Sequence, residues 1–82
     1  MVKTVTNLPL FERRIRQLDE ALKSKLKKLI DKIVENPAVG KPLRYVRKGT
    51  RELYMHPFRL SYSYDPQSDA VTFLDLYHKK RQ

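Results

Sequence analysis

The chain of 82 residues contains no cysteine and no tryptophan, only two glycines and two histidines, and half as many acidic as basic residues. Without cysteine, disulfide bonds, thiolate catalysis and cysteine-ligated zinc are excluded. No apolar run approaches the roughly 20 residues that span a membrane, and residues 1–4 do not open a signal peptide. Two glycines are too few for a glycine-rich phosphate-binding loop. These absences predict a cytoplasmic domain that is not attached to a membrane.

Basic residues dominate the charge of the chain. Eighteen Lys and Arg against nine Asp and Glu give a net charge of +9. Such a charge favours nucleic acid, a ribosome, an anionic membrane surface or an acidic protein as partner. Hydrophobic residues make up 40% of the chain, which is too many for simple disorder. We therefore expect one folded domain over residues 1–82, with a thin core.

The first half of the sequence predicts a strand and two helices. Residues 2–6 read as a short strand, and Pro9 suits the first turn of a helix that begins near Asn7 or Leu8. Asp19 can cap a second helix, although the two helices can also run on with a kink. The apolar residues of the first helix are Leu10, Phe11, Ile15 and Leu18.

The second helix has a single apolar stripe and ends at Asn36-Pro37. Its stripe consists of Leu22, Leu26, Leu29, Ile30, Ile33 and Val34. Two amphipathic helices in a row indicate a helical hairpin laid on a sheet.

The second half predicts an antiparallel sheet, because β-branched and tyrosine-rich runs alternate with turns. After a turn at residues 40–42, the strands are expected at 43–46 (an edge strand), 50–56, 59–64 and 70–77. The fold class is therefore α+β: a short N-terminal strand, a two-helix hairpin, then a three- to four-stranded antiparallel sheet.

A hairpin centred on Pro57 and Phe58 would place His56 opposite Arg59. Alternation then sorts the hairpin side chains onto two faces. The helix side receives Leu53, Met55, Leu60, Tyr62 and Tyr64, and the open side receives Glu52, Tyr54, His56, Arg59, Ser61 and Ser63. In the last strand a bulge near Asp75 would reverse the alternation, so the direction of His78 stays open at this stage.

Arg59 and His78 are the candidate reactive pair. An arginine holds two phosphate oxygens at once, and a histidine can protonate a departing oxygen near neutral pH. We expect both to converge on one electropositive hollow. Glu52 can act as base or only orient Arg59. The alternatives are an Arg59 paired with Glu52 or Asp65, and a His78 that is solvated or caps the core.

Further basic and aromatic residues predict an RNA-binding rim, since lysine and arginine follow phosphates and tyrosines stack on bases. The rim consists of Arg44, Arg47, Lys48, Tyr54, Tyr77, Lys79, Lys80 and Arg81. The histidines are far apart and the acids are not clustered, so no metal site and no cofactor are expected.

The whole chain resembles the RelE/ParE toxins of bacterial and archaeal toxin–antitoxin pairs. The resemblance rests on the order of elements and on four segments: Gly-Lys-Pro-Leu at 40–43, Arg-Glu-Leu at 51–53, Phe-Arg-Leu-Ser-Tyr at 58–62, and Tyr-His-Lys-Lys at 77–80. It implies a RelE-like, microbial ribonuclease-type fold. Members of the RelE and YoeB kind are mRNA interferases, metal-independent endoribonucleases that cut mRNA on the ribosome by attack of the 2′-OH on the phosphate, and so inhibit translation.

By this resemblance Arg59 corresponds to the arginine on the scissile phosphate and His78 to the YoeB-type C-terminal histidine. Arg51 and Glu52 lie near the positions of the catalytic lysines of the RelE type, but this chain has no lysine pair there. Leu43 stands where YoeB-like enzymes carry a glutamate. The implied partners are ribosome, mRNA and a small cognate antitoxin with an acidic or amphipathic segment.

Two alternatives to ribosome-dependent mRNA cleavage stay open. A ParE-like inhibitor of DNA gyrase without nuclease activity suits the fold and charge equally. An inactive member of the family that only binds its antitoxin would explain the missing lysine pair and glutamate.

Overall fold

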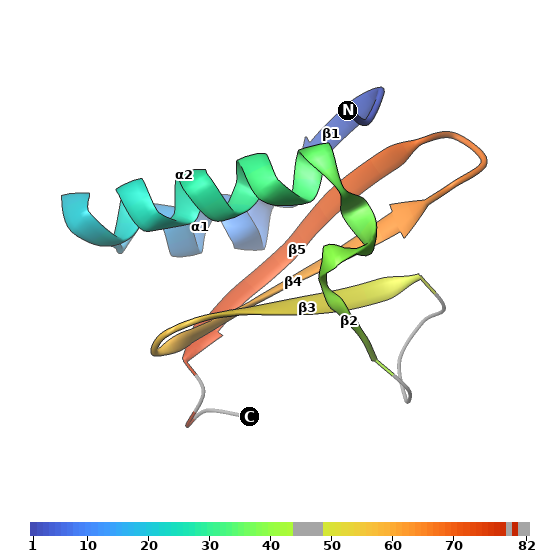
Figure 1. The fold of residues 1–82 in the computed structure, drawn as a ribbon. Helices are drawn as coiled ribbons and strands as arrows, with labels where there is room; N and C mark the ends of the chain where they lie inside the picture. Colours follow the sequence, from blue (N-terminus) through green and yellow to red (C-terminus); the bar gives the residue numbers. More distant parts are fainter. Residues whose placement is uncertain (44–48, 79, 81–82) are drawn as a thin grey trace.

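The structure, a computed structural model, describes residues 1–43, 49–78 and 80. Two helices cover one face of a five-stranded sheet (Figure 1). The helices are α1 (Pro9–Arg16) and α2 (Glu20–Glu35), followed by the short 3₁₀ helix η1 (Pro37–Val39). The strands are β1 (Thr4–Asn7), β2 (Lys41–Pro42), β3 (Thr50–Met55), β4 (Phe58–Asp65) and β5 (Ala70–His78).

The sheet order is β1-β5-β4-β3-β2, in which β1 runs parallel to β5 and the other neighbours are antiparallel. The predicted α+β class and order of elements are confirmed. The N-terminal strand, however, joins the same sheet, so the sheet is mixed. The expected strand at 43–46 falls mostly outside the described residues, and β2 occupies part of the segment that was predicted as a turn.

Local sequence signals place both helices. Leu8 precedes Pro9 at the start of α1, as predicted. The Asp19 carboxylate accepts a hydrogen bond from the Leu22 N–H at 2.8 Å, so α2 begins as a separate helix instead of continuing α1. Asn36 ends α2, and its side chain caps η1 by accepting from the Ala38 N–H at 3.2 Å.

Two N-terminal expectations are wrong in detail. The first strand covers residues 4–7 instead of 2–6, and Val2 is buried, with its N–H bonded to the Val34 carbonyl at 3.1 Å. Leu10 is exposed, because the buried stripe of the first helix runs through Phe11, Ile15 and Leu18 at spacings of four and three residues.

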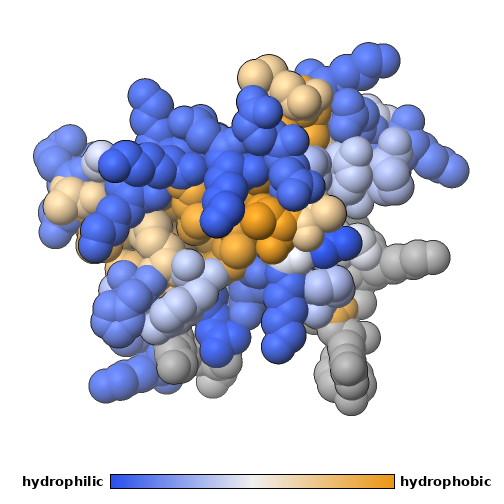
Figure 2. Space-filling model, in the orientation of Figure 1, coloured by the Kyte–Doolittle hydropathy of each residue, from blue (hydrophilic) through white to orange (hydrophobic). Residues whose placement is uncertain are grey.

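The core lies between the helix layer and the sheet. In Figure 2 hydrophobic side chains gather in a band between α2 and the sheet, with hydrophilic side chains on either side. The rings of Phe11 and Phe73 stack with centroids 5.3 Å apart, and Tyr62 packs on Phe73 at 6.2 Å. The other fully or almost fully buried side chains are Leu26, Ile33, Leu60, Val71 and Leu76.

The β3–β4 hairpin turns at His56-Pro57, so Tyr54 lies opposite Arg59 and Met55 opposite Phe58. The predicted register, with His56 opposite Arg59, is therefore wrong by two residues. Because side chains alternate with a period of two, this shift leaves the paired side chains of β3 and β4 on their predicted faces, whereas His56 lies in the turn. Met55, Leu60 and Tyr62 are buried in the core, as expected.

A β-bulge in β5 reverses its alternation halfway. Tyr62 pairs with Phe73 but Ser61 pairs with Asp75, which leaves Leu74 as the extra residue. Leu76 thus joins Phe73 in the core, and Asp75 and Tyr77 move to the other side of the strand. This is the reversal that the sequence left open.

One buried tyrosine fixes η1 and β2 to the sheet. The Tyr62 hydroxyl donates to the Pro37 carbonyl at 2.7 Å and accepts from the Gly40 N–H at 2.9 Å. Burial raises the pKa of this hydroxyl above its usual value. A Cβ at Gly40 would lie 2.8 Å from Tyr62 Cε1, so only glycine permits this approach.

We predict that Tyr62→Phe lowers the free energy of unfolding by ~1–3 kcal/mol, because the buried Gly40 N–H and Pro37 carbonyl lose their partner. Tyr54→Phe is the matched control: its hydroxyl is exposed, and a change below ~0.5 kcal/mol is expected. Urea denaturation followed by circular dichroism measures both. Equal effects of the two substitutions would contradict the anchoring role of Tyr62.

Candidate functional site

The sheet face opposite the helices carries no helix in the described part of the chain (Figure 1). We call it the open face. Glu52 and Tyr54 reach it from β3, Arg59 from β4 and Tyr77 from β5. Cross-strand pairing sets Arg59 between Tyr54 and Tyr77. Three neighbouring strands therefore bring these side chains together, and with Lys41 they form what we call the Arg59 cluster.

Glu52 is the centre of this cluster. Arg59 Nη1 donates to Glu52 Oε1 at 2.7 Å, and the Tyr77 hydroxyl donates to Glu52 Oε2. The Glu52 side chain is 11% exposed and that of Arg59 is 31% exposed. Both carboxylate oxygens are thus engaged in a partly desolvated site, where charge-assisted hydrogen bonds are stronger than at an open surface. The pairing of Arg59 with Glu52, which the sequence left open as an alternative, is confirmed.

A hollow of about 370 Å³ opens beside the ion pair. Its lining includes Arg59, Glu52, Tyr54 and Lys41. Lys41 is exposed and lies opposite Glu52 across the β2–β3 pairing. Lys41 was not predicted as a site residue, because residues 40–42 were expected to form a turn. Only the pairing of this segment with β3 brings Lys41 to Glu52.

Tyr54 stands at the rim of the hollow and is 49% exposed. Its hydroxyl lies 2.8 Å from His56 Nδ1, and the two rings meet edge to face with centroids 5.9 Å apart. This places an accessible aromatic side chain next to two cations and a carboxylate. Such a combination suits contact with a nucleotide base.

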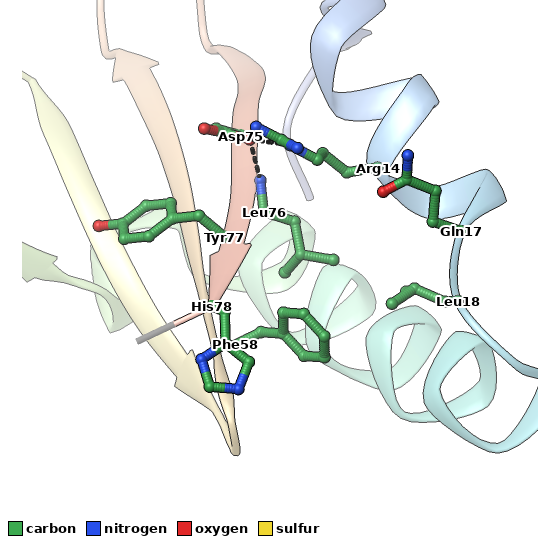
Figure 3. Close-up of a pocket in the computed structure, with 8 residues that line it drawn as sticks. All are labelled: Arg14, Gln17, Leu18, Phe58, Asp75, Leu76, Tyr77 and His78. Carbon is green, nitrogen blue, oxygen red and sulfur yellow. Dashed lines mark hydrogen bonds and ion pairs between the residues drawn. The ribbon is translucent and has the colours of Figure 1, made fainter. Parts of the chain in front are cut away.

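His78 does not belong to this cluster. It lies opposite Phe58, and the two rings meet edge to face at 5.7 Å. Figure 3 shows Tyr77 pointing across the strands, away from the side where Phe58 and Leu76 face the helices. The predicted convergence of Arg59 and His78 is therefore wrong: the bulge at Leu74 puts them on opposite sides of the sheet.

Arg51 is also directed away from Arg59. Its Nη1 donates to the Gly40 carbonyl at 2.7 Å and to the Ala38 carbonyl at 3.2 Å. It lies opposite Tyr62, on the helix side of β3. The expectation that Arg51 assists at the phosphate is therefore corrected: it holds the segment that follows α2.

Of the predicted rim, Tyr54 and Tyr77 lie in the Arg59 cluster. Lys80 is exposed, and its N–H donates to His78 Nδ1 at 3.2 Å. The other five predicted contacts lie outside the described residues: Arg44, Arg47, Lys48, Lys79 and Arg81. Within residues 1–43, 49–78 and 80, no three His, Asp or Glu side chains are grouped as metal ligands would be. No described helix is long and apolar enough to span a membrane.

Solved structures with a similar fold include RelE toxins and their complexes with antitoxins. The similarity to the isolated E. coli RelE toxin covers 96% of this chain and 86% of that chain (15% identity, TM-score 0.81). It matches the RelBE2 toxin–antitoxin complex of Mycobacterium tuberculosis at 25% identity, covering 96% of this chain and 100% of that chain (TM-score 0.78). The archaeal RelE–RelB complex of Pyrococcus horikoshii OT3 matches over 100% of both chains (15% identity, TM-score 0.82).

No curated protein matches the sequence significantly. The family described as "ParE toxin of type II toxin-antitoxin system, parDE" matches residues 8–82. This match spans nearly the whole chain, and the fold agrees with the RelE structures. The chain therefore belongs to the RelE/ParE family of type II toxins.

Proposed function

We propose that this toxin inhibits translation by cleaving mRNA on the ribosome, with the Arg59 cluster as its reactive centre. The observation that carries the proposal is the Arg59–Glu52–Tyr77 arrangement beside a lysine-lined hollow on the open face. A net charge of +9 draws such a face toward RNA. Because ribosomes are the proposed site of action, the proposed location is the cytoplasm.

Arg59 is the phosphate-binding group of this proposal. Its guanidinium is always charged. When RNA binds, the guanidinium leaves the Glu52 carboxylate and binds the scissile phosphate. Two N–H groups on the phosphate stabilise the additional negative charge of the pentacoordinate transition state. Lys41, across β2–β3, contributes a second positive charge to the same hollow.

Glu52 and Tyr77 carry the protons. When Arg59 turns to the phosphate, Glu52 becomes the base that takes the proton of the RNA 2′-OH. The 2′-oxygen attacks phosphorus, the bond to the 5′-oxygen breaks, and Tyr77 gives its hydroxyl proton to that oxygen. The Tyr77–Glu52 hydrogen bond then returns the proton from Glu52 to Tyr77, so the cycle closes with no net change in the enzyme. The products are a 2′,3′-cyclic phosphate and a 5′-OH.

The RNA is held on either side of this centre. Tyr54 stacks on a base at the rim of the hollow. The predicted contacts in the segments that the structure does not describe would extend the basic surface along the RNA backbone. These are Arg44, Arg47, Lys48, Lys79 and Arg81, with the described Lys80.

A cognate antitoxin is the proposed protein partner. The structures of similar shape include RelE–RelB and RelBE complexes. The basic character of this chain predicts that the antitoxin contributes an acidic or amphipathic segment.

The second candidate is a ParE-type inhibitor of DNA gyrase. One observation favours it: His78 and Arg59 lie on opposite sides of the sheet, so a YoeB-type acid is missing from the cluster. Supercoiling by purified gyrase separates the two functions. Inhibited supercoiling with intact mRNA decides for the gyrase inhibitor, and cleaved mRNA with normal supercoiling decides for the nuclease.

We predict that Arg59→Ala lowers the single-turnover rate of mRNA cleavage on programmed ribosomes by about 10²–10³-fold, the usual effect of removing one transition-state donor. His78→Ala should leave the rate within about 3-fold, since a group outside the reactive centre contributes little to the barrier. Arg13→Ala, on the exposed surface of α1, is the control for loss of charge. A loss with His78→Ala that equals the loss with Arg59→Ala, in proteins of unchanged melting temperature, would contradict the site.

Lys41→Met should weaken RNA binding and slow cleavage by about 10-fold, and Lys41→Arg should restore most of both, because the proposal requires a charge at this position. In Lys41→Met, the slope of the logarithm of the binding constant against the logarithm of the salt concentration should become shallower by about 1, as expected for the loss of one phosphate contact. Lys27→Met removes an equal charge from the exposed surface of α2 and serves as control. The same response to both methionine substitutions would exclude a specific role of Lys41.

A further inference from the structure

Lys41 lies on an edge strand whose backbone pairing gives little restraint. β2 consists of Lys41 and Pro42 and is paired with β3 alone, at the border of the sheet. Pro42 has no N–H to donate, and the next backbone bond runs from the Leu43 N–H to the Thr50 carbonyl at 3.1 Å. Strands are usually longer than this one, because few pairs stabilise a strand poorly. The position of Lys41 therefore depends on the segment that precedes it.

That segment is held from β3 by the Arg51 side chain. Arg51 Nη1 donates to the Gly40 carbonyl at 2.7 Å and to the Ala38 carbonyl at 3.2 Å. A guanidinium serves several acceptors with one rigid, charged group, and such charge-assisted hydrogen bonds are stronger than neutral ones. Tyr62 bonds the same segment at Pro37 and Gly40 and lies opposite Arg51 in the sheet. Arg51 and Tyr62 together form what we call the clamp.

The clamp reaches Lys41 through one peptide bond. The Gly40 carbonyl, the Lys41 nitrogen and the Lys41 Cα lie in one plane, because the peptide bond does not rotate freely. A hydrogen bond that fixes the Gly40 carbonyl therefore restricts the direction in which the Lys41 side chain leaves the backbone. The hollow beside the Arg59–Glu52 ion pair depends on the same segment, since Val39 and Lys41 are two of its lining residues.

Arg51 itself lies on the other side of β3 from the open face. It is opposite Tyr62 on the helix side, whereas the next residue, Glu52, projects to the open face and binds Arg59. Consecutive residues of one strand thus hold the two cations of the hollow. Glu52 bonds Arg59 directly, and Arg51 holds the backbone beside Lys41.

We propose that Arg51 is a positioning residue for RNA binding: it holds Lys41 beside the hollow through the clamp and does not itself touch the RNA. This inference rests on the proposed function, in which Lys41 supplies a positive charge to the phosphate. A lysine on a fixed backbone loses less conformational freedom when RNA binds than a lysine on a mobile one, so its phosphate contact gains affinity. The clamp therefore acts on this one contact and leaves the other RNA contacts unchanged.

A double-mutant cycle of Arg51→Met and Lys41→Met tests this coupling. The probe is a fluorescein-labelled single-stranded RNA with 2′-O-methyl groups, which lacks the 2′-OH that the proposed reaction requires. Fluorescence anisotropy measures its binding to the full chain. Arg51→Met should weaken binding about 5-fold in the wild-type background and less than about 2-fold in the Lys41→Met background, because Arg51 acts only through Lys41.

The salt dependence of binding supplies a readout that loss of stability alone would not move. In Arg51→Met the slope against the logarithm of the salt concentration should become shallower in the wild-type background only, because one phosphate contact is lost there. Arg16→Met, on the exposed surface of α1, removes an equal charge and serves as control. Its effect should be the same in both backgrounds.

Two results of the cycle would overturn the inference alone. An equal loss with Arg51→Met in both backgrounds would show that Arg51 acts independently of Lys41, and no loss in the wild-type background would show that it does not act on RNA binding. A Lys41→Met chain that binds RNA like the wild type would instead overturn the proposed role of Lys41, and this inference with it.

Arg51→Lys carries the test if Arg51→Met does not fold, because it keeps the charge but replaces the fork of donors by a single amine. Exchange of the Gly40 amide, which donates to Tyr62, should be at least about 3-fold faster in Arg51→Lys and unchanged in Lys41→Met. The affinity of Arg51→Lys for the RNA should fall about 2-fold, and only when Lys41 is present. Unchanged exchange of the Gly40 amide in Arg51→Lys would show that Arg51 does not hold the segment.

Discussion

The Glu52 carboxylate joins the side chains on which the proposed chemistry depends. Its two oxygens receive Arg59 from β4 and Tyr77 from β5, so one residue on β3 ties three strands together on the open face. Such charge-assisted bonds contribute ~1–3 kcal/mol each when partly desolvated, which suffices to hold the guanidinium in one place. The same bonds neutralise Arg59 in this structure. In the proposed reaction, RNA would have to displace this carboxylate before Arg59 holds its phosphate.

The side chains at the end of β5 lie on two sides of the strand. The Tyr77 hydroxyl bonds Glu52 in the Arg59 cluster, whereas Leu76 is buried in the core and the His78 ring packs on Phe58. Both arrangements follow from one bulged residue, Leu74. Without the bulge, His78 would share a face with Arg59 and Leu76 would leave the core. A local irregularity of the backbone thus decides that Tyr77, and not His78, shares a face with Arg59.

Much of the fold could be predicted from the sequence, because the responsible signals are local. The apolar stripe of α2, the Asp19 cap and the stop at Asn36 act within one or two helical turns. The faces of the hairpin were predicted correctly although its register was not, since an error of two residues preserves alternation. Leu10 was misplaced because it lies beside the stripe of Phe11, Ile15 and Leu18 that packs on the core.

The candidate site could be predicted only in part, because its members depend on pairings between distant segments. Arg59, Glu52, Tyr54 and Tyr77 were expected near one another or at the rim, and the structure joins them. Lys41 depends on the β2–β3 pairing, and the exclusion of Arg51 depends on its bonds to the Gly40 and Ala38 carbonyls, neither of which has a local sequence signal.

The most direct measurement is the single-turnover cleavage rate of ribosome-bound mRNA by Tyr77→Phe, with Tyr54→Phe as the matched control. We predict a loss of about 10²–10⁴-fold for Tyr77→Phe, the usual contribution of a proton-transfer group, and a change within a few-fold for Tyr54→Phe. A Tyr77→Phe enzyme that cleaves at the wild-type rate would contradict the assignment of the Glu52–Tyr77 pair as the proton carrier.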